Sequence, residues 1–215
     1  MIIPRITKPY EPGLPALGDD LENYLVTAGG SVTLKLEPGD KFKIINLEGL
    51  QQAELVAFNS KGECSLSPLS LKSEHKGELT KKILTSNDES AQIAFSKLKR
   101  LGHEVNSINQ SVLVFSKEAQ ANSIEEFESN DSSICIISAP GETEITHENI
   151  PASELRVIVQ RSRKREEGEF LLPDPLMDPV EEIFVNRYTA MSYEVKEGDF
   201  IQIIDIYGRQ CSDFM

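Results

Sequence analysis

The sequence has few residues of the kinds that mark disulfide-bonded or nucleic-acid-binding proteins. It holds three cysteines and three histidines in 215 residues, and 22 Lys and Arg against 35 Asp and Glu, for a formal net charge of −13 at pH 7. Cys64, Cys135 and Cys211 are too far apart for a zinc knuckle or a redox pair. We therefore expect free thiols in a reducing compartment, with Cys135 buried in a strand.

The shortage of positive charge argues against nucleic acid as a partner, because binding of the phosphate backbone needs a basic stripe. The one basic cluster, at 161–165, is followed at once by acidic residues, which is typical of a solvated linker. No apolar run approaches the roughly 18 residues of a membrane span, and the N-terminus has no signal-peptide core. We expect a cytoplasmic protein without nucleic-acid or membrane partners.

The sequence contains no self-sufficient catalytic constellation. His75, His103 and His147 share no ligand spacing, so we predict no metal site. A glycine-rich phosphate loop and a nucleophile elbow are also missing from the sequence. Catalytic residues therefore stay unassigned.

A stretch near residue 40 recurs near residue 199. Pro38–Leu55 aligns with Glu197–Phe214 when Gly198, which lies 159 positions after Gly39, is placed on it. So long a period predicts domain-sized copies rather than stacked modules. We read the chain as the front part of a longer protein and expect the first domain to pack on the rest of the second. The predicted organisation is an extended arm at 1–30, a first domain at 31–165, a linker at 166–182 and the start of a second domain at 183–215.

Hydrophobic periodicity predicts mainly strands. Alternation at 32–36 indicates a half-buried strand, and one helix is predicted between Ser86 and Gly102 from apolar residues at helical spacing. Short helices are also expected at 19–25 and from Ser123. Further strands are predicted at 41–47, 53–58, 111–116, 133–138 and 154–161, the first two forming a hairpin. The order lacks regular βαβ alternation, which favours an α+β fold: a mostly antiparallel, β-rich domain, sandwich or barrel-like, with one side helix.

The repeated segment supplies candidate site residues. With turns at Gly49 and Gly208, Asn46 faces Gln51 in the first copy, and Asp205 faces Gln210 in the second. The next repeated polar position, Glu54 or Asp213, falls on the opposite sheet face unless a bulge intervenes. Either these side chains share a pocket, or the glutamine satisfies a turn while the acid points to solvent or forms an ion pair. The candidates for substrate binding are Asn46, Gln51, Glu54, Asp205, Gln210 and Asp213, with turn glycines Gly39, Gly49, Gly198 and Gly208.

The second copy resembles the opening of the urea-carboxylase-associated family, a domain of unknown function. The residues that match this family in order are Gly198, Asp205, Gly208, Gln210, Asp213 and Phe214. The first copy departs from the pattern at Asn46, Glu54 and Leu55, and the family's later His-Asp and cysteine-rich elements have no counterpart after Asn59. The first domain therefore looks like a diverged, non-catalytic partner.

This resemblance implies a multidomain enzyme of amine or one-carbon metabolism. Tandem versions resemble the N-terminal part of proteins whose C-terminal half is similar to the glycine-cleavage T protein, an aminomethyltransferase. That arrangement implies tetrahydrofolate in a C-terminal domain and no cofactor in this part. The alternative is a carboxyguanidine-deiminase-like hydrolase, in which Asp205, Gln210 and Asp213 orient a planar amidine. A non-enzymatic binding module is the third alternative. The expected ligand is a small amine, urea or guanidine derivative.

Overall fold

The computed structural model describes residues 21–87, 89–141, 152–163, 180–186, 188–199, 201–205 and 213. The chain divides into two units, one spanning Leu17–Lys164 and the other holding residues 1–16 and 165–215. Within the described ranges, no helix has the length and apolarity to cross a lipid bilayer.

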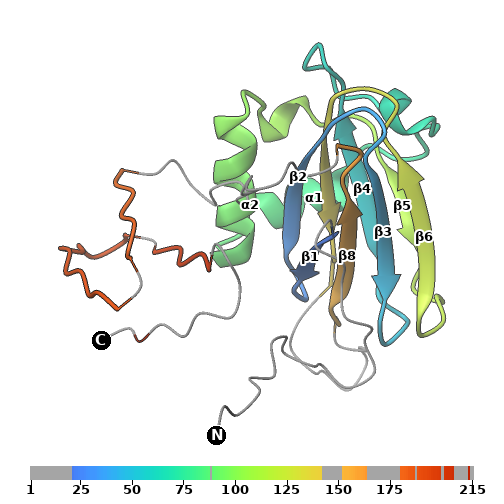
Figure 1. Ribbon diagram of the computed structural model, residues 1–215. Coiled ribbons are helices and arrows are strands. Elements are labelled where there is room, and N and C mark those ends of the chain that lie inside the picture. Colours follow the sequence, from blue (N-terminus) through green and yellow to red (C-terminus); the bar gives the residue numbers. More distant parts are fainter. Residues whose placement is uncertain are drawn as a thin grey trace, which may run out of the picture. The chain divides into compact units, whose positions relative to one another are not determined.

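The Leu17–Lys164 unit consists of two four-stranded antiparallel sheets (Figure 1). The strands are β1 (Leu21–Val26), β2 (Ser31–Leu36), β3 (Lys41–Asn46), β4 (Ala53–Phe58), β5 (Val112–Phe115), β6 (Ser123–Glu128), β7 (Ser133–Ser138) and β8 (Leu155–Gln160). One sheet has the order β1-β8-β3-β6 and the other β2-β7-β4-β5. Strand β1 pairs with β8, β2 with β7, β3 with β6 and β4 with β5, which is the arrangement of an eight-stranded jelly roll.

Two helices complete the unit, α1 (Glu78–Leu84) and α2 (Glu89–Arg100), together with the 3-10 turns η1 (Ser67–Leu69) and η2 (Val105–Ser107). The helices cover the outer face of the β2-β7-β4-β5 sheet (Figure 1). That sheet is therefore buried on both faces. Leu55 and Ala57 of β4 point between the sheets, while Val56 and Phe58 pack under the helices. The predicted α+β fold is confirmed as a two-sheet sandwich, with a second helix, α1, that we had not predicted.

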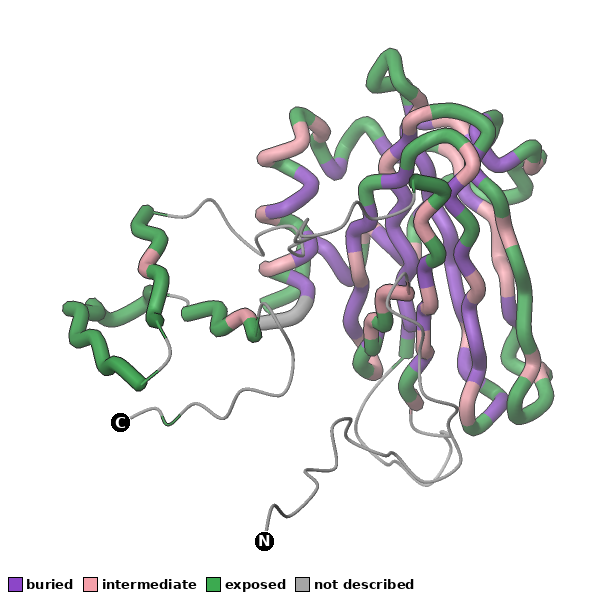
Figure 2. Tube along the Cα trace, viewed as in Figure 1, coloured by how far each residue is buried: buried purple, intermediate pink, exposed green. Residues whose placement is uncertain are grey.

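Apolar side chains fill the space between the sheets. Much of the backbone of the strands is coloured as buried in Figure 2. The larger of these apolar side chains include Val26, Leu34, Leu36, Phe42, Ile44, Leu55, Phe115, Ile137, Leu155 and Val159. Phe42 stacks on Phe127 with ring centroids 5.0 Å apart. The interior of this jelly roll is thus a packed core.

Three local predictions are wrong. Residues 21–26, inside the segment predicted as an arm with a short helix, form β1 and pair with β8. Ser123 begins β6 rather than a helix. The strands at 41–46 and 53–58 are present but belong to different sheets, so they do not form a hairpin. The connection between them, at 47–52, crosses from one sheet to the other.

Candidate functional site

Asn46 and Gln51 lie together at the end of the sandwich where the chain crosses between the sheets. The Asn46 side chain donates from Nδ2 to the Gln51 carbonyl at 2.8 Å and accepts at Oδ1 from the Gly49 N–H at 3.0 Å. Gln51 Nε2 donates to the carbonyls of Gln52 and Pro140, each at 2.8 Å, and its Oε1 accepts from the Ser153 N–H at 2.7 Å. Both side chains are buried. They bind main-chain groups of three chain segments and so hold this end of the fold together.

Glu54 lies elsewhere, beneath α1. Its Oε2 accepts from the Thr80 N–H at 2.6 Å, and its Oε1 accepts from Ser111 Oγ at 2.9 Å. Ser111 Oγ in turn accepts from the Gly77 N–H at 2.8 Å. A bulge between Ala53 and Glu54 interrupts the pairing with β5, yet it does not bring Glu54 to Asn46 and Gln51. Glu54 is 2% exposed, so the alternative that it points to solvent is wrong.

The second-copy candidates are only partly described. Asp205 and Asp213 are exposed, while Gln210 lies outside the described residues. Gly198 has the positive φ, 92°, that its predicted role in a turn requires, as do Gly39 at 85° and Gly49 at 79°. Gly208 also lies outside the described residues. A substrate role for the six candidates stays a prediction.

An ion-pair cluster that we had not predicted joins the two ends of the Leu17–Lys164 unit. Arg161, which follows β8, donates from Nε and Nη2 to the two carboxylate oxygens of Glu22, each at 2.8 Å. Its Nη1 reaches Asp40 Oδ2 and the Lys35 carbonyl, also at 2.8 Å. The Arg161 side chain is 21% exposed and that of Asp40 3%. Arg161 is therefore not the solvated linker residue that we predicted. Its partners are more than 100 positions away in the sequence, so no local signal could have identified them.

Asp40 has an unusual protonation equilibrium because of this cluster. Burial alone would raise the pKa of Asp40, but the N–H groups of Glu37 and Ser162 and the Arg161 guanidinium hold its pKa below the ordinary value of 3.8. Burial opposes the charge of Arg161 too, yet its hydrogen bonds to Glu22 and Asp40 raise its pKa above the ordinary value. Both groups are thus charged at neutral pH.

The stability contribution of Asp40 is expected to depend on pH. Because its folded-state pKa is depressed, the contribution is complete above pH 3.8 and is lost as the pH falls through the lower folded-state pKa. Wild type and Asp40→Asn should therefore differ in free energy of unfolding by a constant amount near neutrality, and the difference should shrink below pH 3.8. Urea unfolding from pH 7 to pH 3 measures it. Glu128→Gln, in an exposed pair with Lys41, is the control. A gap between wild type and Asp40→Asn that widens in acid would contradict the assignment.

The two described thiols are buried, and the described histidine His103 packs on an aromatic ring. Cys64 and Cys135 are free and buried, as predicted for Cys135. Burial raises the pKa of the Cys135 thiol to about 12, against a hydrogen bond with Ser133 that lowers it. His103 stacks on Phe58 with ring centroids 4.4 Å apart, and burial lowers its pKa. Among the described residues, no three His, Cys, Asp or Glu side chains lie close enough together to hold a metal ion.

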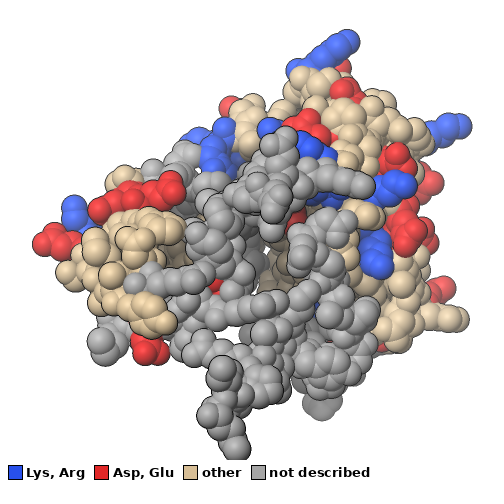
Figure 3. All heavy atoms as spheres, in the orientation of Figure 1, with Lys and Arg blue, Asp and Glu red and all other residues tan. Residues whose placement is uncertain are grey.

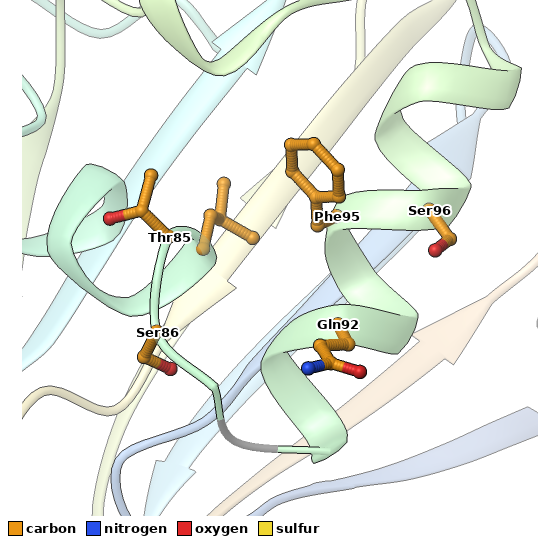
Figure 4. A pocket seen from close by; sticks show the side chains of 6 residues that line it. Thr85, Ser86, Gln92, Phe95 and Ser96 are labelled. Carbon is orange, nitrogen blue, oxygen red and sulfur yellow. The ribbon is translucent and has the colours of Figure 1, made fainter. Parts of the chain in front are cut away.

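An open groove of about 500 Å³ lies between the end of α1 and α2 (Figure 4). Phe95, 38% exposed, stands at its centre. Its lining consists of Leu84, Thr85, Ser86, Gln92, Phe95 and Ser96. None of these is an acid, base or thiol, so the groove suits contact with an apolar group better than chemistry. On the face shown in Figure 3, the basic and acidic side chains of the described residues are mixed.

Comparison with known proteins gives one strong sequence similarity. No known family model matches the chain. The chain is 35% identical over 220 residues to trimethylamine-oxide aldolase of Ruegeria pomeroyi (strain ATCC 700808 / DSM 15171 / DSS-3), a match that covers 99% of this chain and 27% of that protein. The chain thus spans about a quarter of the length of this curated relative.

A solved structure shows a weaker likeness. The crystal structure of a DUF1989 family protein from Silicibacter pomeroyi DSS-3 has a TM-score of 0.44 and 12% identity, over 75% of this chain and 85% of that one.

The name of the Ruegeria pomeroyi relative refers to an amine oxide, which agrees with the amine chemistry expected from the sequence. Membership of the urea-carboxylase-associated family and fusion to an aminomethyltransferase stay predictions.

Proposed function

We propose that these 215 residues form the N-terminal region of a longer cytoplasmic enzyme of amine metabolism that cleaves trimethylamine oxide or a closely related amine oxide. The observation that carries the proposal is the 35% identity to trimethylamine-oxide aldolase. It extends over 99% of the chain, so it includes both the jelly roll and the repeated segment rather than one short motif.

The proposed reaction balances without a further reactant. An aldolase releases an aldehyde, and trimethylamine oxide has the atoms of dimethylamine plus formaldehyde. The N–O bond and one C–N bond break, a carbon–oxygen double bond forms, and one methyl hydrogen ends on nitrogen. Formaldehyde is the one-carbon unit that tetrahydrofolate takes up as a methylene group with loss of water. This chemistry supports the finer proposal that an aminomethyltransferase-like region with tetrahydrofolate follows in the same polypeptide.

Within such an enzyme, we assign the jelly roll of the Leu17–Lys164 unit a structural role. Its interior is a packed apolar core, and the polar side chains of Asn46, Gln51 and Glu54 are bound by groups of the unit itself. Their second-copy counterparts, Asp205, Gln210 and Asp213, are therefore the better candidates for substrate contact. The 215 residues alone are then expected to be inactive.

The test is turnover by the full-length protein. We expect it to convert trimethylamine oxide to equal amounts of dimethylamine and formaldehyde, and free formaldehyde should fall when tetrahydrofolate is added. Asp213→Asn should reduce turnover, whereas Glu54→Gln, at the equivalent position of the first copy, should reduce stability but not the turnover of the folded protein. Both products are quantified by chromatography after derivatisation.

Two other outcomes would replace the proposal. Release of ammonia from carboxyguanidine, without cleavage of the amine oxide, would favour the deiminase-like alternative. Absence of both activities in folded full-length protein would leave the binding module as the better description.

A further inference from the structure

The sequence repeat extends well before Pro38 when the offset of 159 positions is kept. Residues 180–185 then fall on β1, residues 190–195 on β2, and residues 201–205 on β3 from Phe42 onward. Glu181 falls on Glu22, the partner of Arg161, and Asp199 on Asp40. The apolar residues of the second copy that fall on core positions of the first are Val185 on Val26, Tyr193 on Leu34, Val195 on Leu36, Ile201 on Phe42 and Ile203 on Ile44.

The turn between the second and third of these segments has the same hydrogen bonds in both copies. Asp40 N–H donates to the Glu37 carbonyl at 3.0 Å, and Glu37 N–H donates to Asp40 Oδ2 at 3.0 Å. In the second copy, Asp199 N–H donates to the Lys196 carbonyl at 3.0 Å, and Lys196 N–H donates to Asp199 Oδ2 at 2.7 Å. Each turn also has a glycine at positive φ before its aspartate.

The preceding turn also matches. Gly30 N–H donates to the Thr27 carbonyl at 2.9 Å, and at the equivalent positions Thr189 N–H donates to the Asn186 carbonyl at 3.2 Å. The residue before each donor has a positive φ, 73° at Gly29 and 61° at Tyr188. Tyrosine rarely adopts a left-handed backbone. The two turns therefore share this conformation even though the second has no glycine at the position of Gly29.

The two copies differ completely in burial. Val26, Leu34, Leu36, Phe42 and Ile44 are at most 2% exposed, whereas their five counterparts are between 39% and 60% exposed (Figure 2). Large apolar side chains that recur at core positions but lie open mark a surface that needs a partner. None of the described residues in 180–205 is in a helix or strand.

The jelly-roll pairing explains why these segments are not strands here. In the first copy, β1 pairs with β8, β2 with β7, and β3 with β6 and β8. The first three strands do not pair with one another, so their backbone groups find partners only in the last three. A segment with the sequence of three such strands cannot form a sheet alone.

We propose that residues 180–205 are the first three strands of a second jelly roll, completed by later segments of the same longer polypeptide that correspond to β6, β7 and β8. Glu181 and Asp199 are then the counterparts of Glu22 and Asp40, and we expect them to bind an arginine that follows the last strand of the second jelly roll, as Glu22 and Asp40 bind Arg161. The exposed apolar side chains of 180–205 are therefore covered by these later strands of the same polypeptide. The role assigned to Glu181 and Asp199 is positional, closing the second domain around whatever site it contains.

Hydrogen exchange tests this inference without any substrate. In the full-length protein, amides at 180–205 should exchange at least about 100-fold more slowly than in the 215-residue chain. Asp199→Ala in the full-length protein should return them to fast exchange and leave β2 and β3 protected. Glu197→Gln, a neighbouring acid in the same turn whose counterpart is Pro38, is the matched control and should change neither. A double variant that combines Asp199→Arg with replacement of the partner arginine by aspartate should restore slow exchange of the amides at 180–205.

Each outcome decides a part of the inference. Fast exchange at 180–205 in the full-length protein would overturn the second jelly roll. Slow exchange that is insensitive to Asp199→Ala would overturn the ion-pair cluster. The inference shares with the proposed function only the longer polypeptide, so protection without turnover would reject the aldolase and keep the second domain.

Discussion

Replacing Arg161 with methionine is expected to lower the free energy of unfolding of the Leu17–Lys164 unit by about 3 kcal/mol, the lower end of the range for breaking a buried ion pair. Methionine keeps much of the apolar stem but leaves Asp40, 3% exposed at its side chain, without its cation. The same change releases Glu22, so the contact between β1 and the end of β8 is weakened. Hydrogen exchange of the β1 and β8 amides measures the loss.

Lys41→Met provides the matched control. Lys41 pairs with Glu128 at 3.4 Å, and the two side chains are 61% and 53% exposed. An exposed pair of this kind contributes about 0.5 kcal/mol or less. Equal losses in the two variants would show that the Arg161 cluster acts as an ordinary surface pair, and the closing role given to it would be wrong.

Local pattern was sufficient for most of the elements. The alternation of Val32, Leu34 and Leu36 predicted β2, and the apolar spacing within 86–102 predicted α2. These patterns arise because one face of the element is buried and the other is exposed, so residues close together in the sequence are enough to reveal them. The two strands mistaken for helices, β1 and β6, are the edges of their sheet. Edge strands tolerate charged side chains, so the acids of β6, such as Glu125 and Glu126, conceal its period of two.

Sheet pairing and the site could not be predicted from local pattern. A jelly roll pairs residues far apart in sequence, such as Leu21 with Gln160, and nothing near either residue specifies the other. Helix α1 has seven residues, too few to be stable alone, and its first turn is held by Glu54 from 26 positions away. Asn46 was predicted to face Gln51 across a hairpin, and that hairpin is not formed. The two residues are instead joined by the hydrogen bond from Asn46 Nδ2 to the Gln51 carbonyl, within a connection that crosses between the sheets.

Substituting alanine for Gly49 is expected to cost about 3 kcal/mol of unfolding free energy, the sum of a left-handed backbone and an overpacked contact. Gly49 has a φ of 79°, and a Cβ there would lie 2.6 Å from the backbone nitrogen of Ala121 and 2.9 Å from the Ala119 carbonyl oxygen. Backbone atoms cannot turn aside as a flexible side chain can. The crossing connection would have to move, which would break the hydrogen bond from Leu50 N–H to the Ala119 carbonyl.

Gly102→Ala separates the two causes. Gly102 has a similar φ of 85°, but a Cβ there meets nothing within 4 Å. Its substitution should therefore cost only the left-handed backbone, about 1–2 kcal/mol. Urea unfolding of the two variants gives the comparison, and the excess at Gly49 is the cost of the contact between the 47–52 and 119–122 connections. Equal losses would mean that these connections are free to separate, and that Asn46 and Gln51 do not hold this end of the sandwich closed.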